Sequence, residues 1–326
     1  MVKFLFLLAI LSKITTELES RITDNFNGTL TEKYLLDIGY NLESESIILD
    51  DKNLNITSIA PFTFSNFTKL KNVSLSFNSI EIITSSAFSG MKTAENLALY
   101  STGVRTIENN SFIDLNNLIS LNMFANVIEN LNQDTFSGLN SLENLNLGFN
   151  GLSIIDSSLL SDLASLKSIC FYSNQILALN STDLFANNKY LENINLAQNN
   201  LTFIHEDIFF GLSQLQQIDL SYNHLISIEP RLFLNLERLF FIDLSNNQIT
   251  FLDKNLFRNL SSIFQINLQN NNFKTIDFNA IQESKGIKFI CLLSYSFFYN
   301  FTLNVTGLKN IRIEDSLNLN CGYNPS

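Results

Sequence analysis

The chain has 326 residues, a net charge of −11 at pH 7 and a pI near 4.7. This acidity disfavours nucleic acid and anionic membrane surfaces as partners, because both repel a negatively charged protein. The two histidines, His205 and His224, lack the spacing of metal ligands, and no G-x-S-x-G motif, phosphate loop or dinucleotide fingerprint occurs. We therefore expect no metal, no cofactor and no catalytic residues.

The first segment has the order of a secretory signal peptide, with Lys3 ahead of the apolar run Phe4 to Leu11. That run is too short to span a bilayer. We expect a signal peptide at 1–16 and an N-terminal flank at 17–45. No later segment has eighteen consecutive apolar residues, and no apolar tail follows for a lipid anchor. The sequence thus predicts a secreted, extracellular protein with no membrane span.

Nine copies of one sequence motif, which we call the phrase, follow, mostly 24 residues apart. The phrase reads L-x-x-L-x-L-x-x-N-x-L-x-x-L, then four variable residues and a Phe. Only the step from Leu166 to Leu191 differs, at 25 residues. Self-similarity at this period indicates a solenoid. The copies open at Leu70, Ala94, Leu118, Leu142, Leu166, Leu191, Leu215, Leu239 and Ile263.

Each apolar position in a copy has a predicted role. The alternation at Ile218 and Leu220 predicts a short strand with one buried face, and strands of successive copies should stack in parallel. The ninth position is Asn in eight copies, and its amide should satisfy backbone groups where the chain turns inside. Thr102 replaces it once and should weaken this ladder only locally. The residue eighteen positions after each opening should pack in the core; it is Phe in most copies, Leu160 and Ile281 in two, and Phe185 is displaced by one residue.

The repeated phrase resembles the leucine-rich repeat, and the resemblance covers about two thirds of the chain. Its 24-residue form with Phe is similar to the typical subclass of extracellular proteins, including Toll-like receptor ectodomains and secreted insect immune proteins. The resemblance implies an α/β solenoid, a horseshoe with a parallel β-sheet on the concave face and an irregular or short helical convex side. It also implies recognition of proteins or microbial molecules. The N-terminal flank has no cysteine and so departs from the disulfide-bonded cap common in extracellular relatives.

Degenerate copies are expected to cap both ends of the solenoid. Ile47 and Leu49 belong to a poor first copy, and Ile287 and Ile290 restart the phrase near the end. A last strand is expected around Ile313. We therefore predict repeats over 46–300, with the nine clear copies at 70–286, and a C-terminal cap at 301–326. About ten strands at ~4.8 Å give an inner rim of roughly 45 Å.

The sequence contains ten N-x-S/T sequons, which are acceptors for N-linked glycan in a secreted protein. Only one of them, Asn72, falls in a predicted strand. Asn66, Asn109, Asn180 and Asn259 are predicted on the convex or descending side, so glycans should leave most of the concave sheet bare. The sequons are Asn27, Asn55, Asn66, Asn72, Asn109, Asn180, Asn200, Asn259, Asn300 and Asn304.

The fifth position of each copy is expected at the centre of the exposed sheet. Asp219 and Asp243 occupy it in neighbouring copies and should face each other as like charges. A basic group of a partner or a cation would relieve their repulsion. Alternatively, I-D-L-S is a common sequence in such repeats and both carboxylates are simply solvated. This is the interpretation we favour.

Aromatic residues along the two edges of the sheet are a second candidate surface, because exposed aromatics often mark interaction sites. At positions seven and eight they either bind a partner or cover the sheet edge. The adjacent Phe240 and Phe241 cannot both be core, and we predict that they belong to a partner surface. The candidate binding residues are Phe240, Phe241, Phe264, Phe289, Asp219, Asp243, Tyr100, Phe124 and Tyr172.

Three cysteines leave one unpaired within a monomer. Cys170 and Cys291 share position five but lie five repeats apart, roughly 24 Å, which is too far for a disulfide. We predict a bond between Cys291 and Cys321 that ties the C-terminal cap to the last repeat. Cys170 is then either an unpaired thiol or an intermolecular bridge in a homo- or heterodimer.

These features favour a secreted, non-enzymatic recognition protein. Its expected partner is an extracellular protein or glycan ligand bound on the concave face, in innate immunity or extracellular signalling. The alternative is a structural or adhesive matrix component that self-associates.

Overall fold

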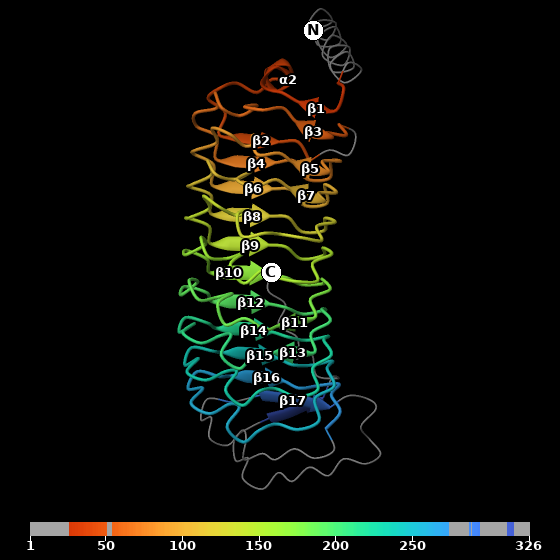
Figure 1. Cartoon of the computed structure of the whole chain (residues 1–326), viewed down its shortest axis with the longest axis vertical. Helices are drawn as coiled ribbons and strands as arrows, with labels where there is room; N and C mark the ends of the chain where they lie inside the picture. Colours follow the sequence, from red (N-terminus) through yellow and green to blue (C-terminus); the bar gives the residue numbers. More distant parts are fainter. Residues whose placement is uncertain (1–25, 51–53, 274–286, 288, 294–311, 316–326) are drawn as a thin grey trace, which may run out of the picture.

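The computed structural model describes residues 26–50, 54–273, 287, 289–293 and 312–315. In this part of the chain, twelve short strands form one parallel sheet that runs along the molecule, in the order of the sequence (Figure 1). The strands are β2 (Ser46–Ile48), β4 (Asn72–Ser74), β6 (Asn96–Ala98), β8 (Ser120–Asn122), β9 (Asn144–Asn146), β10 (Ser168–Cys170), β12 (Asn193–Asn195), β14 (Gln217–Asp219), β15 (Phe241–Asp243), β16 (Gln265–Asn267), β17 (Phe289–Leu293) and β18 (Arg312–Asp315).

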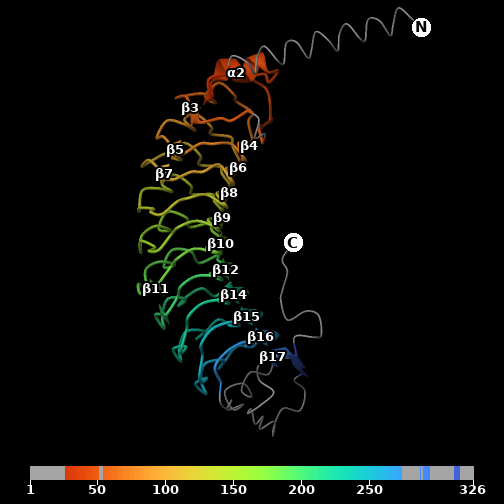
Figure 2. The same ribbon diagram turned by 90° about the vertical axis from the view of Figure 1, so that its right-hand side faces the viewer.

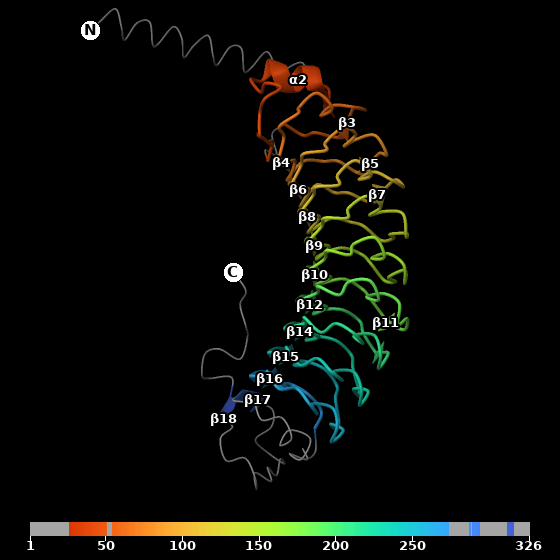
Figure 3. The ribbon, with the colours of Figure 1, turned by 90° about the vertical axis from the view of Figure 1, so that its left-hand side faces the viewer.

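The sheet lines the concave side of a curved solenoid (Figures 2 and 3). The opposite side consists of turns and of two-stranded parallel sheets, so the convex side of the described residues is irregular rather than helical. The predicted leucine-rich-repeat horseshoe is confirmed, with twelve strands in place of about ten. The small sheets pair β1 (Thr29–Leu30) with β3 (Ser58–Ile59), β5 (Ile82–Ile83) with β7 (Thr106–Ile107), and β11 (Ala178–Leu179) with β13 (Phe203–Ile204).

The N-terminal flank contains α2 (Glu32–Asp37), the one helix of the described residues. Thr31 caps it, because its side-chain oxygen accepts a hydrogen bond from the backbone N–H of Tyr34 at 3.1 Å. Tyr34 and Leu35 are buried against the first turns of the solenoid. This flank therefore closes the core with apolar side chains. The predicted signal peptide at 1–16 lies outside the described residues.

The predicted repeat register is confirmed by the strand pairing. Ile218 pairs with Ile194 on one side and with Ile242 on the other, and all three are buried. The phenylalanines of the convex side are also core residues. Their rings stack from repeat to repeat, with centroids 5.8 Å apart between Phe88 and Phe112.

The asparagines at position nine form a hydrogen-bonded ladder that Thr102 interrupts once. The amide nitrogen of Asn199 donates to the carbonyls of Leu196 and Phe171 at 3.1 and 2.9 Å. Its amide oxygen accepts from the backbone N–H of Ile176 at 3.0 Å. Each such side chain thus satisfies buried backbone groups of two successive repeats.

Position eight of every clear repeat holds a left-handed backbone conformation, with φ between 53° and 61°. This conformation is uncommon for residues other than glycine. It ends each strand by turning the chain away from the sheet edge. The residues are Phe77, Ser101, Ala125, Phe149, Ser173, Gln198, Tyr222, Asn246 and Asn270.

Candidate functional site: the concave sheet and its aromatic rim

The side chains at position five, along the middle of the concave sheet, cap the ends of their own strands. The amide oxygen of Asn146 accepts a hydrogen bond from the backbone N–H of Gly148 at 3.0 Å. Asp219 accepts in the same way from Ser221 at 2.9 Å, and Asp243 from Ser245 at 2.8 Å. Short side chains with such an acceptor satisfy local backbone donors. Asn and Asp therefore recur at this position for a structural reason.

Asp219 and Asp243 lie opposite each other in the paired strands β14 and β15, as predicted. The interpretation that both carboxylates are simply solvated is wrong, because Asp243 is 6% exposed. Burial raises its pKa to about 6, and the Asp219 carboxylate contributes to the rise. Burial also raises the pKa of Asp219, against the hydrogen bonds from Ser221. Asp243 additionally accepts a hydrogen bond from the amide of Asn267 at 2.9 Å.

A cluster of three aromatic rings lies at the edge of the sheet where the strands end. The ring of Phe149 is in contact with Phe124 on one side and Tyr172 on the other, with centroids 5.2 and 5.4 Å apart. Gly148 makes this packing possible, because an added Cβ would lie 3.0 Å from the ring of Phe124. Phe149 is 46% exposed, whereas Phe124 and Tyr172 are half-buried. We call these three residues the aromatic rim.

Other aromatics of this edge are more dispersed. Tyr100 is half-buried and packs edge-on against Phe77 with a centroid distance of 4.8 Å. Tyr222 is exposed at position eight, four strands after Phe124 in the sheet. The binding residues predicted from the sequence do not include Phe149 or Tyr222. Their left-handed conformation, which holds each ring at the turn, has no signature in a single repeat.

On the opposite edge of the sheet, only part of the predicted phenylalanine surface is exposed. Phe240 is 43% exposed, and its ring stacks on Phe264 with centroids 5.0 Å apart. Phe241 is 5% exposed, so the prediction that it lies on a partner surface is wrong. It occupies the sheet face between Gln217 and Gln265, and a large ring there is enclosed. The backbone of Phe289 lies in β17, and its side chain lies outside the described part.

The two described cysteines differ in environment. Cys170 is a free, half-buried thiol in β10. Burial raises its pKa and the nearby Asp219 adds to this, whereas a backbone hydrogen bond from Tyr172 opposes the shift. Cys291 is buried in β17 and disulfide-bonded. Its predicted partner, Cys321, lies outside the described residues, so the pairing itself stays a prediction.

The described sequons have the predicted positions. Asn66, Asn109 and Asn259 lie in exposed turns, and the exposed Asn180 directly follows β11, so all four lie away from the concave sheet. Asn72 lies in β4, where its amide donates to Ser46 and accepts from Asn96. Asn27, Asn55 and Asn200 are also exposed, whereas Asn300 and Asn304 lie outside the described residues. Whether any of them carries glycan stays a prediction.

Within the described ranges, no group of three or more histidine, cysteine or acidic side chains is placed to hold a metal ion. His205 accepts a local hydrogen bond from the backbone of Asp207, and His224 is near Gln248 on a different turn. No helix of the described part is long and apolar enough to cross a membrane.

Family models match the repeats themselves. A model described as leucine rich repeat matches residues 172–225, 189–249 and 218–273. A second, described as a BspA type leucine rich repeat region, matches residues 57–181. Together they cover the chain from 57 to 273 without a gap, which is about two thirds of its length.

The chain is a leucine-rich-repeat protein.

Solved structures show the same fold. A chain of the Drosophila Toll–Spatzle complex matches this leucine-rich-repeat protein with a TM-score of 0.69 and 22% identity over 79% of its length. The glycosylated form of that complex gives a TM-score of 0.70 at 22% identity over 80%. A chain of the TLR13–ssRNA13 complex gives 0.67 at 23% identity over 82%. This protein spans 37% of the length of the first two chains and 41% of the third. No curated protein matches it.

Proposed function

We propose that this leucine-rich-repeat protein is a secreted, non-enzymatic recognition protein that binds a protein or glycan ligand on its concave face. The observation that carries the proposal is the aromatic rim of Phe124, Phe149 and Tyr172 beside the polar sheet. Aromatic side chains contribute much contact area at little cost in conformational freedom. The similarity to a complex described as a hub of development and innate immunity supports a role in immunity or extracellular signalling.

The sheet beside the rim offers space for such a ligand. Its central column is polar and internally hydrogen-bonded, so ligand binding need not rearrange it. The sequon Asn72 lies in β4, two strands before β8, which precedes Phe124. A glycan there would leave the rim accessible. Twelve strands at ~4.8 Å give an inner surface of roughly 50 Å, which suits a protein partner or an extended glycan.

Charge separates this protein from the neighbour that holds RNA. The TLR13 complex contains single-stranded RNA, whereas the present chain carries a net charge of −11. A nucleic acid ligand requires cationic groups to neutralise its phosphates. We therefore propose a protein or glycan ligand and not a nucleic acid.

The test replaces two of the three aromatics of the rim, the central Phe149 and its neighbour Tyr172. A Phe149→Ser/Tyr172→Ser variant should retain its melting temperature within a few degrees and lose most ligand captured from extracellular fluid of the source organism. Phe62→Ser is the matched control, because Phe62 is an exposed phenylalanine with φ of 61° far from the rim. Unchanged capture by the folded rim variant would refute the proposal.

A second candidate function, self-association in a matrix, is favoured by a stripe of exposed apolar side chains. Five consecutive repeats each place one such residue between the two apolar positions that follow the ladder asparagine. Each is at least 41% exposed. Exposed apolar side chains that recur in successive repeats can form an interaction surface. The stripe consists of Ile154, Leu177, Phe203, Ile226 and Phe251.

Sedimentation velocity distinguishes the two candidates. If the stripe mediates self-association, the wild-type protein should form a concentration-dependent oligomer that Phe203→Ser/Phe251→Ser abolishes. The rim variant should leave that oligomer unchanged. A wild-type monomer at all concentrations would exclude this second candidate.

A further inference from the structure

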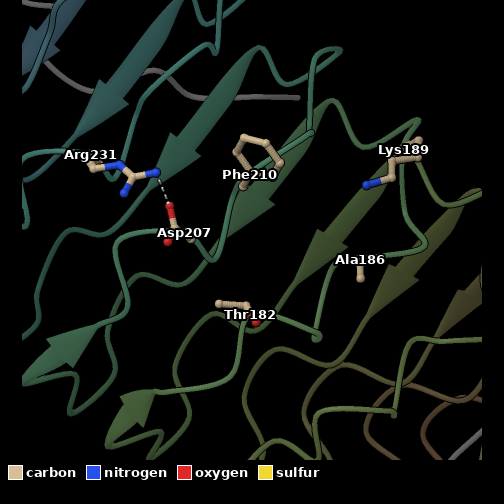
Figure 4. Close-up of a pocket in the computed structure, with 6 residues that line it drawn as sticks. All are labelled: Thr182, Ala186, Lys189, Asp207, Phe210 and Arg231. Carbon is tan, nitrogen blue, oxygen red and sulfur yellow. Dashed lines mark ion pairs between the residues drawn. The ribbon is translucent and has the colours of Figure 1, made fainter.

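A hollow of about 430 Å³ lies on the side of the solenoid away from the concave sheet (Figure 4). Its lining residues come from three consecutive repeats, in the turns that follow β11 and β13 and in the next equivalent turn. Its volume is in the range of small-ligand sites. The lining residues are Thr182, Ala186, Lys189, Asp207, Phe210 and Arg231.

The hollow forms because a small residue precedes a large one in the same structural position. Ala186 and Phe210 each follow a buried Phe of the convex stack, and those two rings, Phe185 and Phe209, are 6.0 Å apart. Ala186 and Phe210 are therefore neighbours on the surface. The methyl group of Ala186 leaves space beside the ring of Phe210, which is 62% exposed.

This is also the place where the repeat is irregular. The extra residue of the 25-residue repeat lies between Leu179 and Phe185, because the other repeats have one residue fewer between the equivalent positions. The inserted segment contains Thr182, which lines the hollow. The one departure from the 24-residue period thus falls at this surface.

The charges around the hollow leave one cation without a counter-ion. Arg231 is paired with Asp207 at 3.1 Å and with Glu206 at 3.8 Å. Lys189 is paired with no carboxylate in the described part of the chain. Its ammonium lies over Gly211, since an added Cβ there would be 3.0 Å from Nζ. The close-up shows the ring of Phe210 between the Arg231–Asp207 pair and Lys189 (Figure 4).

We propose that this hollow binds one acidic sugar residue of an extracellular glycan. The Lys189 ammonium receives the carboxylate or sulfate, and the ring of Phe210 packs against the apolar face of the sugar ring. Asp207, held by Arg231, and the hydroxyl of Thr182 are placed to bond sugar hydroxyls. This site is independent of the concave face, and the failure of either proposal leaves the other standing.

Two observations favour an acidic sugar over an apolar ligand and over a long polyanion. Thr182, Lys189, Phe210 and Arg231 are all exposed, so a wholly apolar ligand would remain largely in water. The whole chain carries a net charge of −11, which would repel a long polyanion. A single acid on an otherwise neutral, hydroxyl-rich ring satisfies both conditions.

The test measures binding of immobilised oligosaccharides to the full secreted protein. The probes end in glucuronic acid, sialic acid or 6-sulfated galactose, and the neutral parent of each is the reference. At least one acidic probe should bind about tenfold or more tightly than its parent, because a charge-assisted hydrogen bond is lost in the latter. Lys189→Gln and Phe210→Ser should each remove about this much, and salt should weaken binding. Equal binding of acidic probes and neutral parents would overturn the proposal.

The chain supplies matched controls. Lys92 stands two residues before the opening of its repeat, as Lys189 does, and Lys92→Gln removes the same charge from an equivalent turn. Phe62→Ser removes a ring that is as exposed as Phe210 and belongs to none of the proposed surfaces. Neither should affect binding, and a comparable loss in either would also refute the site.

The protein's own glycan is a second source of sugar, because the sequon Asn180 lies two residues from Thr182. Asn180→Gln separates the two sources. Binding that is the same with and without this change supports a free ligand. Binding that appears only in Asn180→Gln would show that the attached glycan fills the hollow and would overturn the proposal.

Discussion

The carboxylates of Asp219 and Asp243 lie in register on neighbouring strands, and the burial of Asp243 holds its pKa at about 6. Each accepts a backbone hydrogen bond at the end of its strand. The same bonds are made by the neutral amides of Asn146 and Asn195 in earlier repeats. The strand cap therefore needs an acceptor oxygen and not a charge.

Replacing Asp243 by Asn should stabilise the protein at neutral pH. When a carboxyl group has a higher pKa in the folded than in the unfolded protein, the free energy of unfolding falls as the group ionises. For Asp243 this fall occurs as the pH rises from about 4 through about 6. The difference between the folded and unfolded pKa values corresponds to a loss of at most ~3 kcal/mol in the free energy of unfolding above pH 6. We expect Asp243→Asn to gain about 1 to 2 kcal/mol at pH 7.5 and almost nothing at pH 4. Chemical denaturation at both pH values measures this, with the exposed Asp183→Asn as the charge control. An equal gain at both pH values would contradict the titration argument.

Truncating one ladder asparagine should be among the most destabilising single changes. Asn199→Ala removes the donors to Leu196 and Phe171 and the acceptor for Ile176, all buried. Each orphaned backbone group costs about 1 to 3 kcal/mol, so we expect a total loss of roughly 3 kcal/mol or more. Asn200→Ala, at the exposed neighbour, should cost well under 1 kcal/mol. Similar unfolding midpoints for the two variants would show that the ladder is not stabilising.

The break in the ladder at Thr102 should be repairable. The Thr102 hydroxyl lies 2.9 Å from both the carbonyl oxygen of Leu99 and the amide oxygen of Asn126, and these two acceptors share its single proton. In other repeats an asparagine at this position also accepts from the previous repeat, as Asn78 does from Ile56. Within the described residues the equivalent N–H of Ile80 has no such acceptor. Thr102→Asn should therefore raise stability by about 1 kcal/mol. Thermal unfolding tests this, and a lower melting temperature would mean that Asn cannot reach the ladder position there.

Cys170 should remain a free thiol and react slowly. Burial raises its pKa, which lowers the thiolate fraction at neutral pH, and the thiolate is the reactive form. We expect iodoacetamide labelling at pH 7.5 to be at least several-fold slower than in the denatured protein. Asp219→Asn should accelerate it, because that carboxylate contributes to the raised pKa. A covalent dimer that disappears in Cys170→Ser would instead establish the intermolecular bridge.

The core residues could be predicted from the sequence because their pattern is local and repeated nine times. Ile218, Asn223 and Phe233 each have a residue type that only one environment in the repeat accepts. The surface was less accessible, since it depends on neighbours 24 residues away. Phe241 is buried by what lies beside it on the sheet, and nothing in its own repeat distinguishes it from an exposed residue.

The candidate sites show the same limit. Phe149 belongs to the aromatic rim because Gly148 leaves room for a ring from the previous repeat. The hollow at Phe210 exists because Ala186 precedes it in space and the repeat there is one residue longer. To predict such sites, the residues that are neighbours in consecutive repeats must be known. The 24-residue spacing identifies these neighbours only where the repeats have the same length.

The left-handed turn at position eight restricts how this surface can diversify. None of the nine residues found there is valine, isoleucine or threonine, whose branched Cβ is strongly disfavoured at positive φ. Phenylalanine, tyrosine, serine, glutamine, asparagine and alanine all occur. The side chains at this edge of the sheet are therefore restricted to those that are not branched at Cβ. They can be exchanged one repeat at a time, and new specificities can arise there without altering the core.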